Sequence, residues 1–365
     1  MHFWQTLRQQ KKPFFAVAPM ADVTDAAFRR LIVKYGKPDV MWTEFVSANG
    51  LMSEGREALL RDLEYSPTER PIVAQLFSSD PKNIEGAAQL AAELGFDGVD
   101  INMGCPDKTI EKQGAGAAMI KDPAAAVAVI AAAKRGIAAA GKSASRRIPV
   151  SVKTRVGYND VQIDTWISIL LSQNIAALTV HARTRKELSL VPAKWDYIKK
   201  VVELRDKLAP DTVIIGNGDV TSLADGRAKA LASGADGVMV GRALFGNPWF
   251  FDASREVVAA LPQKSLFRNI PILNKFFDTK RTAPTSVAKP ITVTERLTVL
   301  VEHAELFQEL LGDSKSFAIM KKHFKAYCTG FAGAKELRIQ LMETKNAQEV
   351  EAIVQKFLTT QQRGV

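Results

Sequence analysis

Eight short apolar runs, rich in Val and Ile, recur along the first 250 residues, and their spacing constrains the fold more than any other feature of the chain. They are continuous rather than alternating in polarity, and helix-like segments separate most of them. This pattern is typical of a parallel sheet whose strands are buried on both faces. The runs are residues 14–20, 40–46, 71–77, 98–104, 148–154, 176–182, 212–218 and 237–243.

Start and stop signals mark the helices between the runs, because capping residues precede them and glycines follow them. The pairs are Asp80-Pro81 with Gly95, Asp122-Pro123 with Gly141, and Thr221 or Ser222 with Gly234. Eight strand–helix units in roughly 250 residues predict an α/β fold of the (β/α)8, or TIM-barrel, type. A doubly wound open sheet is the alternative, and the even repetition favours closure.

The pattern changes after residue 263. Residues 264–290 contain three prolines and six basic residues against one acid, which predicts a basic linker or insertion. From residue 291 to 365 the apolar spacing is helical, so we expect a barrel domain over 1–263 and a small helical domain over 291–365. One predicted helix carries an apolar face of Phe317, Met320, Phe324, Tyr327 and Phe331, with Lys321, Lys322 and Lys325 away from it.

Charge and cysteine content narrow the functional classes. The 365 residues carry a net charge of +10, with the excess gathered in 264–290 and 141–155. Such clusters fit a polyanionic partner, although basicity also serves solubility. Two cysteines make no disulfide framework and no zinc spacing. No apolar segment reaches the roughly 20 residues needed to cross a bilayer. We therefore expect a cytoplasmic monomer that contacts no membrane and binds no metal.

Polar and small residues gather at the carboxyl ends of the predicted strands, where barrels of this type carry their active sites. Any one of them has a structural explanation as a loop hydrogen-bonding group, but eight strand ends behave alike. They are Pro19, Met20, Ala21, Glu44, Gln75, Asn102 to Cys105, Lys153, Arg155, His181, Arg183, Asn217, Gly218, Gly241 and Arg242.

The ends of the last two strands predict an anion site. They read Gly-Asn-Gly-Asp and Gly-Arg-Ala, and glycines let backbone amides approach a ligand closely while Arg242 adds positive charge. Barrels of this type often bind phosphate at these two loops. Tight turns explain isolated Gly-x-Gly pairs, so the prediction depends on the pairing of the two ends.

Cys105 lies just past the fourth strand, between Gly104 and Pro106. A free thiol has a pKa near 8.5 and is mostly protonated at neutral pH. It is then suited to act as a general acid, or as a nucleophile if a base or cation lowers its pKa. Cys328 falls beside the apolar face of a predicted helix and is expected to be core filler.

The motifs that carry these residues resemble those of the tRNA-dihydrouridine synthase family, in order along the barrel and into the helical domain. The matching segments are PMADVTDAAFRRL (19–31), INMGCPDKTIEKQGAGAAMIKDP (101–123), VKTRVGY (152–158), VHARTR (180–185), GNGDV (216–220), GVMVGRALFGNPWFF (237–251) and MKKHFKAY (320–327).

The resemblance implies an enzyme with bound flavin mononucleotide (FMN) that reduces the C5–C6 double bond of uridines in tRNA, with NADPH as reductant. It implies that Cys105 protonates one carbon while flavin N5 delivers hydride to the other, and that Asn102 contacts the target uracil. Its implied flavin contacts are Pro19, Met20 and Ala21 at the ring edge, Gln75, Lys153 and His181 at the ring, and Asn217, Gly218, Gly241 and Arg242 at the phosphate. Arg155, Arg183, Lys321, Lys322 and Lys325 are predicted to bind the RNA substrate.

The chain departs from the family pattern in two places. After the sixth strand, Ser189, Val191 and Lys194 replace a Tyr, a Gly and an Asp, while Trp195 is retained. The segment 264–290 is also longer than the usual connection. Two other functions share parts of this pattern: a flavin barrel acting on a free pyrimidine, which needs no basic clusters or helical appendage, and a catalytically inactive RNA-binding or chaperone protein. Intact Cys105, Lys153 and His181 argue against the second.

Overall fold

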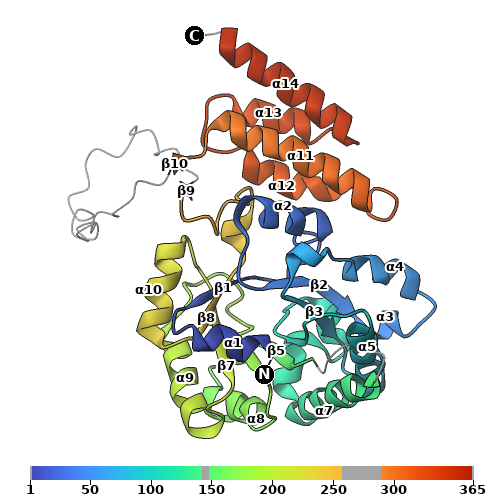
Figure 1. Ribbon diagram of the computed structural model, residues 1–365, viewed down its shortest axis with the longest axis vertical. Coiled ribbons are helices and arrows are strands. Elements are labelled where there is room, and N and C mark those ends of the chain that lie inside the picture. Colours follow the sequence, from blue (N-terminus) through green and yellow to red (C-terminus); the bar gives the residue numbers. More distant parts are fainter. Residues whose placement is uncertain (1, 142–147, 257–288, 364–365) are drawn as a thin grey trace.

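A computed structural model of the chain describes residues 2–141, 148–256 and 289–363. Its centre is a curled sheet of eight parallel strands in the order β1-β8-β7-β6-β5-β4-β3-β2. The two edges meet at a parallel bridge between Ala16 and Val40, which closes the barrel. The predicted TIM-barrel fold is confirmed (Figure 1). The strands are β1 Phe14–Val17, β2 Met41–Ser47, β3 Ile72–Phe77, β4 Gly98–Met103, β5 Val150–Arg155, β6 Ala177–His181, β7 Val213–Asn217 and β8 Gly237–Val240.

The helices around the barrel begin where capping side chains predict. Asp80 accepts a hydrogen bond from the amide of Lys82, Asp122 from that of Ala125, and Ser222 from that of Asp225. Each bond satisfies one of the free amides at a helix start. The α-helices of the barrel are α1 Phe3–Gln9, α2 Ala26–Gly36, α3 Ala48–Leu51, α4 Arg56–Leu60, α5 Pro81–Glu93, α6 Lys108–Lys112, α7 Pro123–Ala139, α8 Ser168–Leu171, α9 Asp196–Leu208 and α10 Leu223–Ser233. Short 3-10 turns cover 61–63, 67–69, 116–121 and 242–244, and a π-turn covers 163–167.

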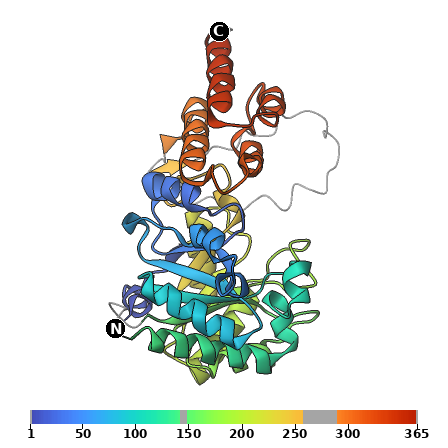
Figure 2. The ribbon, with the colours of Figure 1, turned by 90° about the vertical axis from the view of Figure 1, so that its right-hand side faces the viewer.

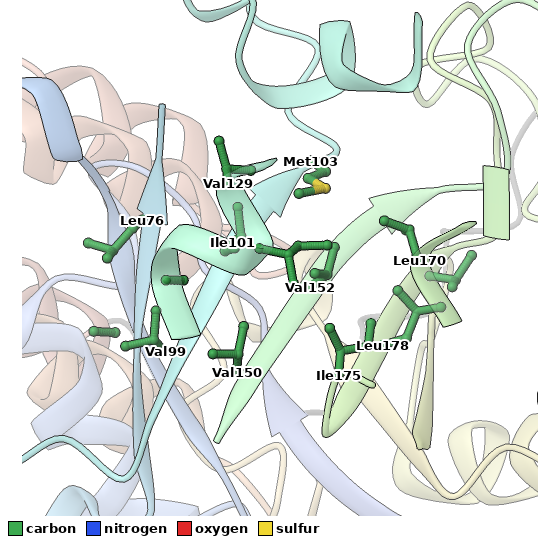
Figure 3. Close-up of a cluster of buried hydrophobic side chains, with 14 of the residues drawn as sticks. Leu76, Val99, Ile101, Met103, Val129, Val150, Val152, Leu170, Ile175 and Leu178 are labelled. Atoms are coloured by element: carbon green, nitrogen blue, oxygen red, sulfur yellow. The ribbon is translucent and has the colours of Figure 1, made fainter. Parts of the chain in front are cut away.

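The barrel is packed on both sides of its sheet. Side chains such as Ile101 and Val152 lie between the strands and the outer helices, where they meet Val129 of α7 and Leu170 of α8 (Figure 3). Inside the barrel, large rings fill the end at which the strands begin. Trp4 of α1 lies 5.6 Å from Trp42, measured between ring centroids. These rings fill the barrel interior at that end, and the polar residues at the strand ends border the opposite end.

The helical unit contains α11 Val293–Leu311, α12 Met320–Tyr327, α13 Ala334–Leu341 and α14 Ala347–Arg363. Thr292 and Glu295 form a reciprocal capping box at the start of α11. The predicted single apolar helix face is wrong in its extent. Phe317 belongs to a separate 3-10 turn capped by Ser316, and Phe331 lies past the end of α12. Both rings still pack on the same hydrophobic cluster as Phe324.

The helical unit stands on α2 of the barrel, as Figures 1 and 2 show. Leu31 of α2 is buried in the core of the helical unit. The ring of Phe28 packs against the imidazoles of His303 and His323, at centroid distances of 5.2 and 5.0 Å, and the two imidazoles lie 4.3 Å from each other. Glu302 of α11 binds Lys34 and Tyr35 at the end of α2. The two units therefore share one hydrophobic interface.

The predicted basic linker falls almost entirely outside the described residues, which resume at residue 289. On either side of that gap, β9 (Arg255–Glu256) pairs in parallel with β10 (Lys289–Pro290). The basic residues at 142–147 also lie outside the described ranges. None of the helices in the described part of the chain is long and apolar enough to span a bilayer.

Candidate active site

Strand register brings the predicted polar residues together at the open end of the barrel. Across neighbouring strands, Asn102 is opposite Lys153, Arg155 is opposite His181, and His181 is opposite Asn217. Neighbouring strands lie about 4.8 Å apart, so these backbones form a continuous arc. Residues that are separated by over 100 positions in the sequence therefore border one site.

A chain of hydrogen bonds leads from the barrel interior to the Cys105 loop. Asp100 accepts from the Gln75 amide nitrogen at 2.6 Å, and the Gln75 carbonyl oxygen accepts from Asn102 Nδ2 at 3.0 Å. Asn102 Oδ1 in turn accepts from the backbone amides of Gly104 and Cys105, at 3.1 and 2.9 Å. Asp100 is buried and its second oxygen accepts from Ser151. Because a carboxylate only accepts hydrogen bonds, Asp100 determines which end of the Gln75 and Asn102 side-chain amides donates and which accepts.

Asp100 was not predicted as a site residue. The available signal was an acid within the apolar run 98–104. Burial raises its pKa to about 6, against the hydrogen bonds from Ser151 and Gln75. Asn102 is buried with both ends of its amide engaged inside the protein, so its contact with a uracil stays a prediction.

The Cys105 thiol is free and half-buried. Burial raises the pKa of this thiol, so it is protonated at neutral pH. Lys153 is half-buried nearby, and burial, followed by the charge of Arg155, lowers the pKa of its ammonium to about 8. No ion pair or hydrogen bond to that ammonium occurs within the described residues. An unpaired, half-buried ammonium is costly unless a ligand accepts from it.

Arg155 and Arg183 are buried, and their guanidinium groups bind loops of the protein itself. Arg155 donates to the carbonyl of Gly104 at 2.7 Å, and to those of Thr184 and Leu188 at 3.1 and 3.2 Å. Arg183 donates to the carbonyl of Val191 at 2.6 Å. Their predicted role in RNA contact is untested, and the observed contacts hold the loops that follow β4 and β6.

His181 is held in its neutral form. Burial, and then the charges of Arg155, Lys153, Arg183 and Arg242, keep the pKa of its imidazole well below the usual value. Arg183 Nη1 lies 3.0 Å from His181 Nε2. Because a guanidinium can only donate, Nε2 must accept, which assigns the ring proton to Nδ1. His181 is therefore a neutral donor at its other nitrogen.

The ends of β7 and β8 present backbone amides. Gly218 is buried and has a φ of +131°, and a Cβ there would lie 2.7 Å from the Cβ of Ala193. Within the described residues, the amides of Gly218, Gly241 and Arg242 have no hydrogen-bond partner. Asn217 donates to the carbonyl of Met239 at 2.9 Å, which ties the two strand ends together. Free amides at two adjacent strand ends suit an anionic ligand.

Asp219, which sequence reasoning also missed, bridges two cations beside these amides. It forms ion pairs with the buried Arg183 and with Arg242, whose side chain is 62% exposed. Its signal in the sequence was an acid directly after Asn217-Gly218. The bridge pre-orients Arg242 at the end of β8.

The three predicted residues after β1 border the same end of the barrel. Pro19 is buried, Met20 is half-buried and Ala21 is exposed. A Cβ placed on Gly241 would lie 3.6 Å from the sulfur of Met20, so the ends of β1 and β8 adjoin. Met20 is held by a bond from its amide to the Thr24 hydroxyl at 2.9 Å.

Two lysines of the helical unit form ion pairs with the barrel, and one of them reaches the loop after β1. Lys322 and Lys325 are exposed and Lys321 is half-buried, and Lys322 pairs with Asp22 at 3.1 Å. A fourth lysine, Lys315, was not predicted. It binds Glu44 of β2 at 2.7 Å and Asp62 at 2.8 Å.

A family model and two curated relatives that match this chain carry the same family name. The family model described as Dihydrouridine synthase (Dus) matches residues 16–362. A protein of Bacillus subtilis (strain 168), "Probable tRNA-dihydrouridine synthase 2", is 36% identical over 98% of this chain and 96% of its own length. A "Probable tRNA-dihydrouridine synthase" of Staphylococcus aureus (strain MRSA252) is 34% identical over 98% and 95%.

Among solved structures, morphinone reductase in complex with tetrahydroNAD aligns with a TM-score of 0.44 at 13% identity, over 65% of this chain and 84% of that one. A DHODH from Eimeria tenella in complex with ferulenol aligns with a TM-score of 0.45 at 12% identity, over 63% and 76%.

Proposed function

This chain belongs to the dihydrouridine synthase family, and we propose that it reduces the C5–C6 double bond of uridines in tRNA, with bound FMN and with NADPH as the reductant. The observation that carries the proposal is the free, half-buried thiol of Cys105, whose backbone Asn102 fixes at the barrel mouth near Lys153 and whose pKa is raised by burial. Saturating a double bond needs a proton as well as a hydride, and this thiol is the proton donor that the site offers. We further propose that the enzyme is cytoplasmic and monomeric and uses no metal.

The residues at the mouth fit a flavin mononucleotide. The unpartnered amides of Gly218, Gly241 and Arg242, together with the Arg242 guanidinium, suit a phosphate. Lys153 and Gln75 would offer an ammonium and an amide to the ring, and Pro19, Met20 and Ala21 would line its edge. Neutral His181 is suited to pack or donate at the ring. When bound, the flavin supplies the hydride that the protein's own side chains lack.

Cys105 would then move one proton. Its thiol donates to one carbon of the uracil C5–C6 bond as the other carbon receives hydride, which leaves a thiolate and a saturated ring. The thiolate regains its proton from solvent. The bonds from Asn102 Oδ1 to the Gly104 and Cys105 amides hold the thiol's backbone in place for this transfer.

Arg155 and Arg183 enter this proposal as positioning residues in place of direct RNA contacts. Arg155 spans from the Gly104 carbonyl to the loop after β6, and Arg183 spans from that loop to His181 and Asp219. Both are desolvated. Removing Arg155 would take this donor from three loop carbonyls, and removing Arg183 would take it from the carbonyl of Val191.

The helical unit would hold the RNA backbone through Lys321, Lys322 and Lys325. Lys322 already touches the loop after β1, so phosphates bound by this group would lie beside the barrel mouth. Contacts of this kind bind RNA irrespective of sequence and weaken with salt.

Incubation of the flavin-loaded protein with NADPH and unmodified tRNA, followed by nucleoside analysis, tests the proposal. Dihydrouridine should form in tRNA, while free uridine and uracil should remain unreduced under the same conditions. Reduction of free uracil with tRNA untouched would make the protein a free-pyrimidine reductase. A protein that takes up no flavin would refute the proposal altogether.

A further inference from the structure

The loop between β6 and α9 exposes three apolar side chains in a row of four residues. Leu190 is 83% exposed, Leu188 is 37% exposed and Val191 is 36% exposed. Two positions on this loop, Ser189 and Val191, are ones at which the chain departs from the family pattern. A single exposed leucine needs no explanation, but a cluster of them on one loop marks a contact surface.

The protein holds this loop firmly. Residues 188–191 form the tip of the loop. Arg155 donates to the carbonyl of Leu188 and Arg183 to that of Val191, so two buried guanidinium groups bind the two ends of this tip. The Leu190 amide donates to the carbonyl of Glu187 at 2.9 Å, and Leu188 adopts a φ of +50°. Leucine rarely adopts that backbone conformation, and residues strained in this way cluster at functional sites.

The loop adjoins the proposed catalytic cysteine. The same Arg155 side chain that binds Leu188 also binds the carbonyl of Gly104, the residue before Cys105. At the other side, Arg185 forms a bidentate ion pair with Glu111 of α6, which follows the Cys105 loop. One set of arginines therefore fixes the apolar tip against the thiol loop.

The surroundings of the tip favour RNA as its partner. Lys186 and Lys194, which flank the tip in the sequence, are exposed, and Glu187 between them is engaged with the Thr184 amide at 2.7 Å. An apolar tip between cations matches a strand that presents base faces and phosphates together.

We propose that Leu188, Leu190 and Val191 cover the face of a nucleobase next to the target uridine. The inference rests on the proposed function. A uridine that reaches Cys105 must leave its stack, which exposes the flat faces of its neighbours to water. Apolar side chains that cover such a face stabilise the opened strand, and Leu190 supplies most of the available area.

The test is the double variant Leu190→Ser, Val191→Thr, assayed with tRNA and NADPH. Its matched control is Leu231→Ser, which removes a leucine that is 74% exposed on α10, on the outer wall of the barrel. We expect kcat/KM for tRNA to fall roughly tenfold to a hundredfold in the double variant, the range that burial of one or two such side chains supports. Flavin reduction by NADPH and the melting temperature of the double variant should stay unchanged. The single variant Leu190→Met, which keeps an apolar side chain, should retain most of the wild-type activity on tRNA.

Wild-type kcat/KM for tRNA in the double variant would overturn the inference, as would an equal loss in Leu231→Ser. Sedimentation analysis tests the alternative that this surface binds a second copy of this chain. If the variant only converts a dimer to a monomer and keeps its activity, the surface is a self-association site. Failure of the wild-type protein to form dihydrouridine is a separate outcome that removes the proposed function, and this inference with it.

Discussion

Replacing Lys315 by methionine should weaken the attachment of the helical unit to the barrel far more than a surface ion pair would. Lys315 precedes the 3-10 turn at Phe317 and binds both Glu44 and Asp62. Its side chain is 15% exposed and that of Glu44 is 5% exposed. Removing one partner of a buried pair leaves an uncompensated charge, which costs about 3–5 kcal/mol. Because Asp62 is partly open to solvent, we expect about 3 kcal/mol of destabilisation at neutral pH.

The same variant should show a characteristic pH dependence. Burial raises the pKa of Glu44, and the charge of Lys315 acts against that increase. Without the lysine, the folded-state pKa of Glu44 rises further above its unfolded value of about 4.3. The carboxylate then destabilises the folded protein above its folded pKa and ceases to do so once it is protonated. The loss of folding stability in Lys315→Met relative to the wild type should therefore be largest near pH 7 and shrink as the pH falls toward about 4.5.

Urea unfolding at several pH values measures both effects, with Lys34→Met as the control. Lys34 forms a comparable link to Glu302 across the same interface, but its side chain is 59% exposed, so its loss should cost at most about 1 kcal/mol. Adding Glu44→Gln to Lys315→Met should recover part of the lost stability. Equal stability of the two lysine variants, or a loss of stability in Lys315→Met that does not depend on pH, would contradict this prediction.

Two further predictions concern the ligands. Arg242→Ala should weaken flavin retention by about 1.5–3 kcal/mol through loss of a charge-assisted contact, measured by fluorescence titration with FMN; unchanged affinity would move the phosphate elsewhere. Replacing Lys321, Lys322 and Lys325 together by alanine should weaken tRNA binding and flatten its salt dependence, because fewer counterions are released. Filter binding at several salt concentrations decides this, with flavin content as the control, and a wild-type slope would exclude these lysines from the RNA surface.

The strands were predictable because they are short, apolar and buried on both faces. The fourth predicted run, 98–104, became β4 over Gly98–Met103. The first run, 14–20, extends past β1, which ends at Val17. The apolar signal continues through Ala18, Pro19 and Met20, but proline has no amide for the ladder, so the strand gives way to a loop there.

The site could be predicted as a set of residues but not as a set of contacts. Position at a strand end identifies Gln75, Asn102 and Lys153, since the topology brings all strand ends to one side. It does not identify Asp100 beneath them, because an acid in a buried strand gives no hint of the amide it will accept from. Lys315 and Glu44 are 271 residues apart, and no local pattern links them.

The partners of the two buried arginines, Arg155 and Arg183, were also not predictable from their positions in the sequence. Their place after β5 and β6 predicts a cationic mouth that binds RNA directly. In the fold, the backbone turns of the loops after β4 and β6 leave carbonyls that need donors, and Arg155 and Arg183 supply them. Which partner an arginine takes depends on loop geometry that composition does not encode.

The most direct test of the account compares wild-type protein with Cys105→Ala in the formation of dihydrouridine in tRNA, while flavin reduction by NADPH is followed in parallel. A general acid contributes typically 10²–10⁴-fold to the rate, so the variant should lose activity on tRNA in that range. Reduction of its flavin should proceed as in the wild type, because the thiol has no part in that half-reaction. A variant that reduces tRNA at the wild-type rate, or one that slows equally in both half-reactions, would contradict the role assigned to Cys105.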